Sequence, residues 1–407
     1  MDLLDVGRIV VGLVLLVLGG ELLVRGASAL ARRVGISSLV VGLTVVSAAT
    51  SAPELAVTIG AVLRDEPGLA VGNVVGSNIV NVLLILGASA VVLPLAVTQR
   101  LVRLDLPLVV VLSTGLLLVS LDGRIGAVDG VLLFSAVVVH TVLTVVVSRR
   151  EAGARAPAGV PPGDRGIAGD AEASAASAAS AASAASAASA ASADNGAAGA
   201  SGSGGEPPPA SVLRSVLLVV LGVALLVAGA SLLVDGAVSI ATSLGVSSLV
   251  VGLTVVAVGT SLPELATSII AVRRGERDLA VGNVVGSNLF NIGVVLGLPA
   301  LISRDGIPVA GAAVALDIPV MLAASVALLP IAFTGFAVAR WEGALFVGLY
   351  AAYTGYVVLA ATEHDALEGF TGTMAWFVLP LIALTLAVLT AYELGLRRGR
   401  RDPGRSP

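Results

Sequence analysis

The sequence contains no cysteine and no lysine, has only two histidines, and draws just 12% of its residues from the charged amino acids. Without cysteine, disulfides, thiolate metal sites and cysteine nucleophiles are excluded. The histidines, His140 and His364, provide no metal-binding histidine cluster, so nothing here supports an enzyme. No basic face with interleaved aromatic residues is present either, and a nucleic-acid partner is not expected.

Apolar residues are abundant, at 57% of the chain with a mean hydropathy of +1.02. These values lie far outside those of soluble globular proteins. About 20 apolar residues are needed for each membrane crossing. The sequence therefore predicts an all-α polytopic membrane protein with eleven membrane helices. They are expected near 6–24, 35–63, 69–94, 102–121, 124–147, 212–234, 245–272, 279–302, 308–333, 338–361 and 373–396.

Arginines cluster after the first, third, fifth, seventh, ninth and eleventh of these helices. Because positively charged loops remain in the cytoplasm, the N-terminus is predicted to be outside the cell and the C-terminus and central linker inside. Asp65, Asp122, Asp235 and Asp305 then lie on the outer side. We expect a multi-pass protein of the cell membrane, in contact with the lipid bilayer. The oligomeric state is not encoded in these patterns, and a monomer is sufficient for the site described below.

Two blocks of sequence occur twice, 210 residues apart. GLTVVSAATSAPEL at 42–55 returns as GLTVVAVGTSLPEL at 252–265, and GNVVGSN at 72–78 returns at 282–288. This recurrence indicates an internal duplication. With five helices in each repeat, the second repeat must cross the membrane in the opposite sense to the first. Inverted repeats that meet near the bilayer midplane are typical of secondary transporters.

The predicted domains follow from this duplication. Residues 1–148 form the first repeat, 212–361 the second, inverted repeat, and 362–407 an extra helix with a basic cytoplasmic tail. Residues 149–211 are rich in alanine, serine, glycine and proline and have no apolar face to bury. They are predicted to be a disordered cytoplasmic linker.

Each duplicated block contains a glutamate, Glu54 in the first repeat and Glu264 in the second. A carboxylate at the bilayer centre costs about 3 kcal/mol, so such a residue predicts a functional site. The preceding Pro53 and Pro263 lack an N–H and are expected to break their helices. Irregular backbone at this depth is tolerated where it lines a cavity. The sequence therefore predicts an oxygen-rich pocket around the two glutamates.

Other polar residues share helix faces with these glutamates. In each repeat a threonine lies four residues before the glutamate and a serine lies four residues before an asparagine, a spacing that places each pair on one helical face. The pairs are Thr50 with Glu54, Ser77 with Asn81, Thr260 with Glu264, and Ser287 with Asn291. Carboxylate, hydroxyl, amide and carbonyl oxygens suit Ca²⁺ and also Na⁺.

The motifs ATSAPE at 49–54 and GTSLPE at 259–264, each followed by GNVVGSN, resemble the two alpha repeats of the calcium/cation antiporter superfamily, prokaryotic sodium/calcium exchanger type. The resemblance covers the first ten helices and leaves out the linker and the last helix. It implies a secondary antiporter, without a cofactor, that exchanges Ca²⁺ for Na⁺ by alternating access. In this family the helices corresponding to 6–24 and 212–234 slide across a rigid core.

The resemblance also assigns roles to residues. It implies that Glu54 and Glu264 are the central Ca²⁺ ligands, assisted by the backbone carbonyls of Thr50 and Thr260. It implies that six further side chains line the flanking Na⁺ sites together with the threonine hydroxyls, or border the central site: Ser51, Ser77, Ser261, Ser287, Asn81 and Asn291.

The sequence departs from the family pattern at two places. The glycine before the first threonine is Ala49, which restricts the backbone slightly. Some exchangers carry an aspartate at one of the positions of Asn81 and Asn291, whereas this chain has amides at both. The pocket then holds two formal negative charges, which one Ca²⁺ or two Na⁺ would balance. The resemblance implies three Na⁺, so the stoichiometry stays open.

Three alternatives to Na⁺/Ca²⁺ exchange are considered. A Ca²⁺/H⁺ antiporter could use the same scaffold, because two glutamates can exchange protons for Ca²⁺. A cation channel would use oxygen ligands too, but would need a continuous symmetric pore rather than an inverted repeat around one site. An intramembrane enzyme could use the paired glutamates as acid and base, yet no nucleophile accompanies them.

Several polar and small residues are predicted to have structural roles only. Asp105 and Asp317 each precede a proline by two residues and are expected to cap helices. His140 is expected to be an ordinary interfacial residue. The glycines of the repeated GNVVGSN blocks are predicted to form helix-packing surfaces rather than ion ligands. They are Gly72, Gly76, Gly282 and Gly286.

Overall fold

The computed structural model describes residues 3–155, 212–245 and 257–401. One compact unit, Met1–Ala152 together with Ala210–Pro407, contains the membrane helices described below. The predicted linker from residue 156 onward lies outside the described residues, as does the first part of the helix predicted at 245–272. Disorder of the linker therefore stays a prediction, although its first residues continue a helix to Arg155, past the boundary predicted at residue 148.

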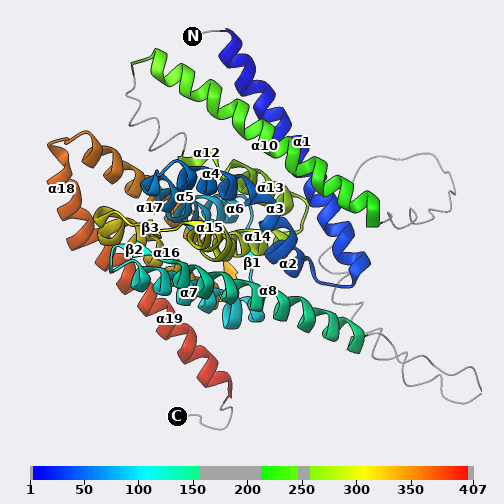
Figure 1. Ribbon diagram of the computed structural model, residues 1–407. Coiled ribbons are helices and arrows are strands. Elements are labelled where there is room, and N and C mark those ends of the chain that lie inside the picture. The colour runs from blue at the N-terminus through cyan, green and yellow to red at the C-terminus, as the bar shows by residue number, and fades with distance from the viewer. Residues whose placement is uncertain (1–2, 156–211, 246–256, 402–407) are drawn as a thin grey trace, which may run out of the picture. The chain divides into compact units, whose positions relative to one another are not determined.

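The first half of the chain forms helices that are interrupted by short π-helical segments, which are named η here. Figure 1 labels the α-helices and strands. Its elements are α1 (Leu3–Val34), α2 (Ser38–Val41), η1 (Gly42–Val46), α3 (Ser47–Thr50), α4 (Ala52–Leu63), α5 (Pro67–Ile79), η2 (Val80–Leu86), α6 (Gly87–Val92), β1 (Leu95–Ala96), η3 (Leu101–Asp105), α7 (Leu106–Val119), β2 (Arg124–Ile125) and α8 (Ala127–Arg155).

Within the described residues, the second half follows the same order of elements and then adds a final helix. Its elements are α10 (Val212–Ser243), α12 (Ala257–Gly259), α13 (Leu262–Arg273), α14 (Arg277–Phe290), η5 (Asn291–Leu296), α15 (Gly297–Ile302), β3 (Ile307–Pro308), η6 (Ala313–Asp317), α16 (Ile318–Phe333), β4 (Ala337–Val338), α17 (Arg340–Ala361), α18 (Ala366–Thr373), η7 (Met374–Val378) and α19 (Leu379–Arg401).

Within the described residues, nine helices are long and apolar enough to cross a membrane, and the bent pair formed by 38–50 and 52–63 makes a tenth. These ten correspond to ten of the eleven predicted helices, and only the helix predicted at 245–272 is described in part. The prediction of an all-helical polytopic membrane protein is confirmed. The arrangement of the two repeats as inverted copies stays a prediction.

The helices α1 and α10 pack side by side and antiparallel (Figure 1). Glycines at seven-residue intervals allow this close approach. A Cβ atom added at Gly12 would lie 2.7 Å from the carbonyl oxygen of Gly229, and one added at Gly19 would lie 2.7 Å from that of Gly222. Small residues let helix backbones approach closely in a membrane, where packing contacts replace the hydrophobic effect as the driving force. An antiparallel pairing of equivalent helices is what an inverted repeat requires.

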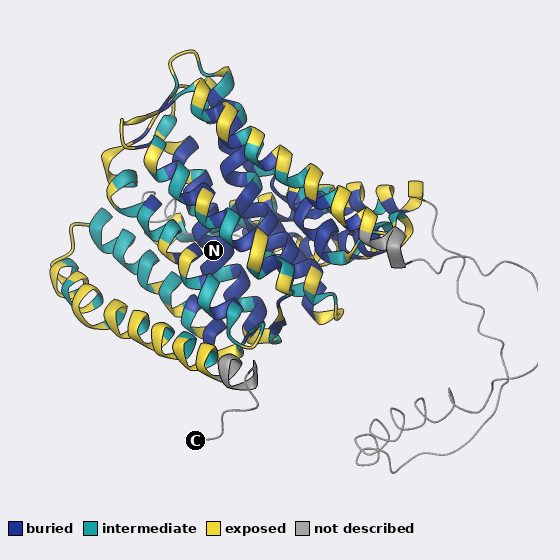
Figure 2. Cartoon of the chain, turned by 90° about the horizontal axis from the view of Figure 1, so that it is seen from below, coloured by how far each residue is buried: buried dark blue, intermediate teal, exposed yellow. Residues whose placement is uncertain are grey.

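The two helices that carry the GNVVGSN blocks form the interior. Of the most apolar 18 residues in the span 67–92, 78% are buried, and in the span 277–302 the share is 72%. In α1 the corresponding share is only 28%. Figure 2 shows the buried residues gathered in the interior and the C-terminal helix exposed. The packing role of the glycines is confirmed for Gly282 and Gly286, which lie against the backbone of α2 and η1. For Gly72 and Gly76 an added Cβ would meet nothing within 4 Å among the described residues. The segment that the repeat places against them, near residues 249–253, lies outside those residues, so their packing role stays a prediction.

Two short antiparallel strand pairs join loops of the first half to loops of the second. In one pair β1 lies against β4, with Leu95 opposite Val338, and in the other β2 lies against β3, with Arg124 opposite Pro308. The first pair joins two loops that the arginine pattern places in the cytoplasm. The second joins two loops that it places outside.

Candidate ion-binding site

The helix that contains Glu54 is broken at Ser51, whose φ and ψ of −82° and 3° depart from helical values. The segments on either side, 38–50 and 52–63, are bent by 43°. Ser261 has nearly the same backbone angles, −93° and 7°. Pro53 and Pro263 then lie in the first turn of α4 and α13, where a missing N–H removes no helical hydrogen bond. The predicted helix breaks are confirmed, two residues before each proline.

The breaks place Glu54 and Glu264 in the first turns of α4 and α13, where the helix dipole favours negative charge. Each glutamate is only 1% exposed. The two carboxylates lie close enough to repel each other. Contacts cross between the repeats: Ser51 Oγ donates a hydrogen bond of 3.5 Å to Glu264 Oε1, and Ser261 lies beside Glu54. The structure therefore brings the two duplicated motifs face to face.

Many buried oxygens of the predicted site residues lack a hydrogen-bond partner. Buried polar atoms are nearly always paired, so a group of unpaired acceptors indicates a place for a ligand. Within the described residues these atoms are Glu54 Oε1 and Oε2, Glu264 Oε2, the hydroxyls of Ser77, Ser261 and Ser287, and the amide oxygens of Asn81 and Asn291. Oxygen acceptors of this kind fit Ca²⁺ or Na⁺ as the transported substrate.

Asn81 and Asn291 lie on helical segments that pack against the broken helix of the opposite repeat. Asn81 lies in η2, which packs against α13, and Asn291 begins η5, which packs against α4. Asn291 Nδ2 donates a hydrogen bond of 3.1 Å to Asn78 Oδ1, which leaves the Asn291 amide oxygen as a free acceptor. Among the described residues, no three Asp, Glu, His or Cys side chains lie together so that they could hold a metal ion, and Glu54 and Glu264 are therefore not joined by a third such ligand.

The two threonines of the motifs differ in position. Thr50 is buried, and its hydroxyl lies 3.3 Å from Asn283 Oδ1. Thr260 is only half-buried and lines a cleft of about 230 Å³ between α4, α10 and the α12–α13 break. The backbone carbonyl that Thr260 is expected to contribute stays a prediction.

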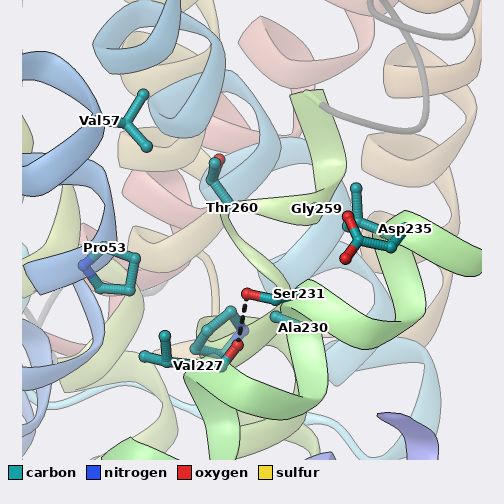
Figure 3. Close-up of a pocket in the computed structure, with 10 residues that line it drawn as sticks. Pro53, Val57, Val227, Ala230, Ser231, Asp235, Gly259 and Thr260 are labelled. Atoms are coloured by element: carbon teal, nitrogen blue, oxygen red, sulfur yellow. Dashed lines mark hydrogen bonds between the residues drawn. The ribbon is translucent and has the colours of Figure 1, made fainter. Parts of the chain in front are cut away.

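The cleft begins beside the glutamates. Its walls include Pro53 and Pro263, the residues that precede Glu54 and Glu264. Figure 3 shows Pro53 and Val57 of α4 on one side and residues of α10 on the other. The full set of lining residues is Pro53, Val57, Val227, Ala230, Ser231, Val234, Asp235, Gly259, Thr260 and Pro263.

Two asparagines near the site, one in each repeat, form side-chain hydrogen bonds that the sequence did not predict. Asn73 Nδ2 donates to Thr58 Oγ1 at 2.9 Å and to the Glu54 carbonyl at 3.1 Å. In the second repeat Asn283 Nδ2 donates to Ser268 Oγ at 3.2 Å. The recurrence of asparagine and a hydroxyl residue 210 positions apart was the signal that could have revealed these contacts.

The predicted capping role of Asp105 and Asp317 is wrong. Neither side chain makes a capping hydrogen bond, because each residue continues a helical segment instead of starting one. Asp105 Oδ1 lies 3.1 Å from His140 Nε2, and Asp317 Oδ1 accepts a 2.9 Å hydrogen bond from Tyr353 Oη. His140 is therefore the partner of a fully buried carboxylate and not an ordinary interfacial residue.

The family described as sodium/calcium exchanger protein matches residues 4–146 and 214–359. The chain belongs to the sodium/calcium exchanger family. The match covers both motif-bearing halves of this exchanger and omits the linker and the last helix. As a member of a transporter family, the protein is a cation antiporter and not an enzyme.

Three relatives illustrate the extent of the similarity. Over 321 residues the exchanger is 35% identical to CaxA of Alkalimonas amylolytica, whose name describes an antiporter, covering 79% of this chain and 87% of the relative. It is 31% identical to the sodium/calcium exchanger MaX1 of Methanosarcina acetivorans, covering 85% and 96%. The sodium-calcium exchanger NCX_Mj, soaked with Na⁺ and Sr²⁺, matches with a TM-score of 0.65 and 28% identity, covering 89% of this chain and 99% of that chain.

Proposed function

We propose that this exchanger moves Ca²⁺ out of the cell in return for Na⁺ moving in, by alternating access. The observation that carries the proposal is the pair of fully buried carboxylates, Glu54 and Glu264, surrounded by unpaired hydroxyl and amide oxygens. An intramembrane carboxylate without a partner is costly. A bound cation removes that cost, and a site that alternates between cations can couple their movements.

The ligand set follows the sequence motifs. Glu54 and Glu264 hold Ca²⁺ centrally, and together they can supply four oxygens. The remaining oxygens come from the backbone at the two helix breaks and from polar side chains beside them, so that the coordination number of Ca²⁺ can be reached. The proposed set is Thr50, Ser51, Glu54, Ser77, Asn81, Thr260, Ser261, Glu264, Ser287 and Asn291.

Sodium is favoured as the coupling ion because the site is rich in hydroxyl groups beyond the two glutamates. Ser51, Ser77 and Ser287 are fully buried. Such groups are ligands for a hard monovalent cation and have little use in a pure proton exchanger. MaX1 and NCX_Mj are both named as sodium/calcium exchangers, which supports the same choice.

A Ca²⁺/H⁺ antiporter is the second candidate. It is favoured by the close approach of two carboxylates that lack cationic partners, since a proton shared between them would relieve their repulsion. Both candidates use the same pocket and the same alternating access. They differ in which gradient drives Ca²⁺ and in whether the transport cycle binds Na⁺.

The orientation is proposed from charge. The arginine pattern places the N-terminus outside and the C-terminus inside the cell membrane. The strand pairs support this assignment, because each joins two loops that the pattern puts on one side. The cleft, which has Asp235 at its rim, then opens toward the exterior.

The test is ⁴⁵Ca²⁺ flux in proteoliposomes with imposed Na⁺ or H⁺ gradients and a clamped voltage. We expect the Na⁺ gradient to drive Ca²⁺ movement and, if three Na⁺ exchange for one Ca²⁺, 100 mV to change the driving force by about 2.3 kcal/mol. Flux that responds to Na⁺ but not to voltage would indicate two Na⁺, the number that the pocket charge balances. Flux that ignores Na⁺ and follows a pH gradient would establish the proton-coupled alternative.

A further inference from the structure

The contacts of α1 and α10 with the broken helices are unequal, although these elements belong to equivalent positions in the two repeats. On one side, α1 packs tightly against α13: a Cβ atom added at Gly20 would lie 2.5 Å from Ile270 Cδ1. The residue 210 positions after Gly20 is Ala230 of α10, which lines the open cleft facing α4. One helix contact is therefore closed while its counterpart is open.

The closed contact carries a cluster of ion pairs. Glu21 of α1 accepts a hydrogen bond of 2.6 Å from Arg274 Nε, and Arg274 Nη2 also contacts this carboxylate. Arg25 Nη2, which also belongs to α1, donates a hydrogen bond of 2.7 Å to Glu21 Oε1. A further pair joins Arg32 to Glu276 at 4.0 Å. These contacts link α1 to the end of α13 and the start of α14.

The open contact has the corresponding charges, but they do not meet across it. Arg64 and Glu66 occupy the positions 210 residues before Arg274 and Glu276, and they pair with each other at 3.6 Å. The counterpart of Glu21 is Ser231, and the nearest acid on α10 is Asp235, one helical turn farther along. Asp235 lines the cleft and forms no hydrogen bond or ion pair with any described residue.

We propose that Glu21 with Arg274 and Asp235 with Arg64 are alternative latches that set which side of the exchanger is open. In this structure the Glu21–Arg274 pair holds α1 against α13, and the cleft beside Asp235 stays open. When the α1–α10 pair shifts to open the opposite side, Glu21 releases Arg274. Asp235 then pairs with Arg64 and closes the cleft.

The Glu21–Arg274 ion pair is weak enough to break and re-form during a transport cycle. The side chains of Glu21 and Arg274 are 31% and 32% exposed. Partly exposed ion pairs of this kind are weak, so either latch can break without locking the protein in one state. Because one interfacial pair is exchanged for another, the two states remain close in energy, and a bound ion can bias the equilibrium between them.

The inference rests on the proposed alternating access, but its test reads only which side of the protein is open. Because the chain has no cysteine, a single introduced cysteine is an unambiguous reporter. Val57→Cys places one on the wall of the cleft, and Thr267→Cys places one at the equivalent, fully buried position of the second repeat. A membrane-impermeant maleimide applied to each face of oriented proteoliposomes measures the labelling rate at each position.

We expect Glu21→Gln to lower the Val57→Cys labelling rate about fivefold and to raise the Thr267→Cys rate, a change of the size that a partly exposed ion pair supplies. Asp235→Asn should leave the cleft at least as accessible as before. The charge swap of Glu21→Arg with Arg274→Glu should restore the original labelling rates. Glu368→Gln, the same chemical change on the exposed helix α18, is the matched control and should alter neither rate.

Unchanged labelling at both reporters in a monodisperse Glu21→Gln protein would overturn the latch. If that variant does not fold, Arg274→Gln removes the same pair from the other helix and is judged by the same criterion. Labelling shifts without any cation-driven flux would reject the proposed function and leave the latch standing. Normal flux without labelling shifts would reject the latch and leave the proposed function standing.

Discussion

At the scale of single residues, Glu54 and Glu264 are buried acidic groups that we propose to be paired with the transported cations. Each is fully buried, and neither forms an ion pair with a described arginine or histidine. The hydroxyl of Ser51 and the first-turn peptide dipoles offset only part of the repulsion between the carboxylates. Cations are therefore expected to stabilise the fold as well as to be transported, since binding to the native state alone raises stability.

We expect Glu54→Gln and Glu264→Gln each to abolish Ca²⁺ exchange while leaving the protein inserted and folded. Each change removes one anionic ligand, and no other described acid is close enough to replace it. The measurements are ⁴⁵Ca²⁺ flux in proteoliposomes and the Ca²⁺-dependent rise of the melting temperature in detergent, both of which should be lost. Near-normal flux in either variant would remove these glutamates from the pocket, and Glu368→Gln serves as the unaffected control.

At the scale of elements, the sequence predicts the helices and the broken motifs because hydrophobic runs, prolines and a strict repeat all have local signatures. It could not predict η2 and η5, since a π-helical segment keeps the composition of its α-helical neighbours. It also placed the C-terminal end of α1 too early, because the helix continues past the apolar run to Val34. The pairing of Asp105 with His140 was missed because it depends on two helices meeting in space.

The glycine contact between α1 and α10 gives a prediction at this scale. We expect Gly19→Ala to destabilise the protein by about 1–3 kcal/mol, because its Cβ would lie 2.7 Å from the Gly222 carbonyl oxygen and force the helices apart. Gly7→Ala, in the same helix, would meet nothing within 4 Å and should change stability by less than about 0.5 kcal/mol. Thermal melting in detergent compares the two, and equal melting temperatures would contradict tight packing of this pair.

At the scale of the whole molecule, the two motif-bearing halves form one compact unit with the site between them. The sequence predicts that the linker between α8 and α10 contributes no part of that site, because it has no apolar face and no counterpart in the repeats. Both flanking helix ends are predicted to lie on the cytoplasmic side, so a short tether is sufficient.

Deletion of residues 160–205 is therefore expected to leave ⁴⁵Ca²⁺ flux and its Na⁺ dependence unchanged. The deletion retains the end of α8 and the start of α10, so each half keeps its described contacts. Flux is measured in proteoliposomes at equal protein content, with size-exclusion chromatography as the control for folding. A folded variant that transports poorly would show that the linker takes part in transport or in its regulation.

The strand pairs have a consequence for biogenesis. The strand pairing of Leu95 with Val338 can form only after the ribosome has made most of the second half. The pairing of Arg124 with Pro308 likewise needs residues that are synthesised much later. The first half thus enters the membrane with strand edges unpaired and with Glu54 facing no completed pocket. Contacts so distant in sequence form late. The insertion machinery must therefore tolerate a half-built exchanger in the bilayer until its second half emerges.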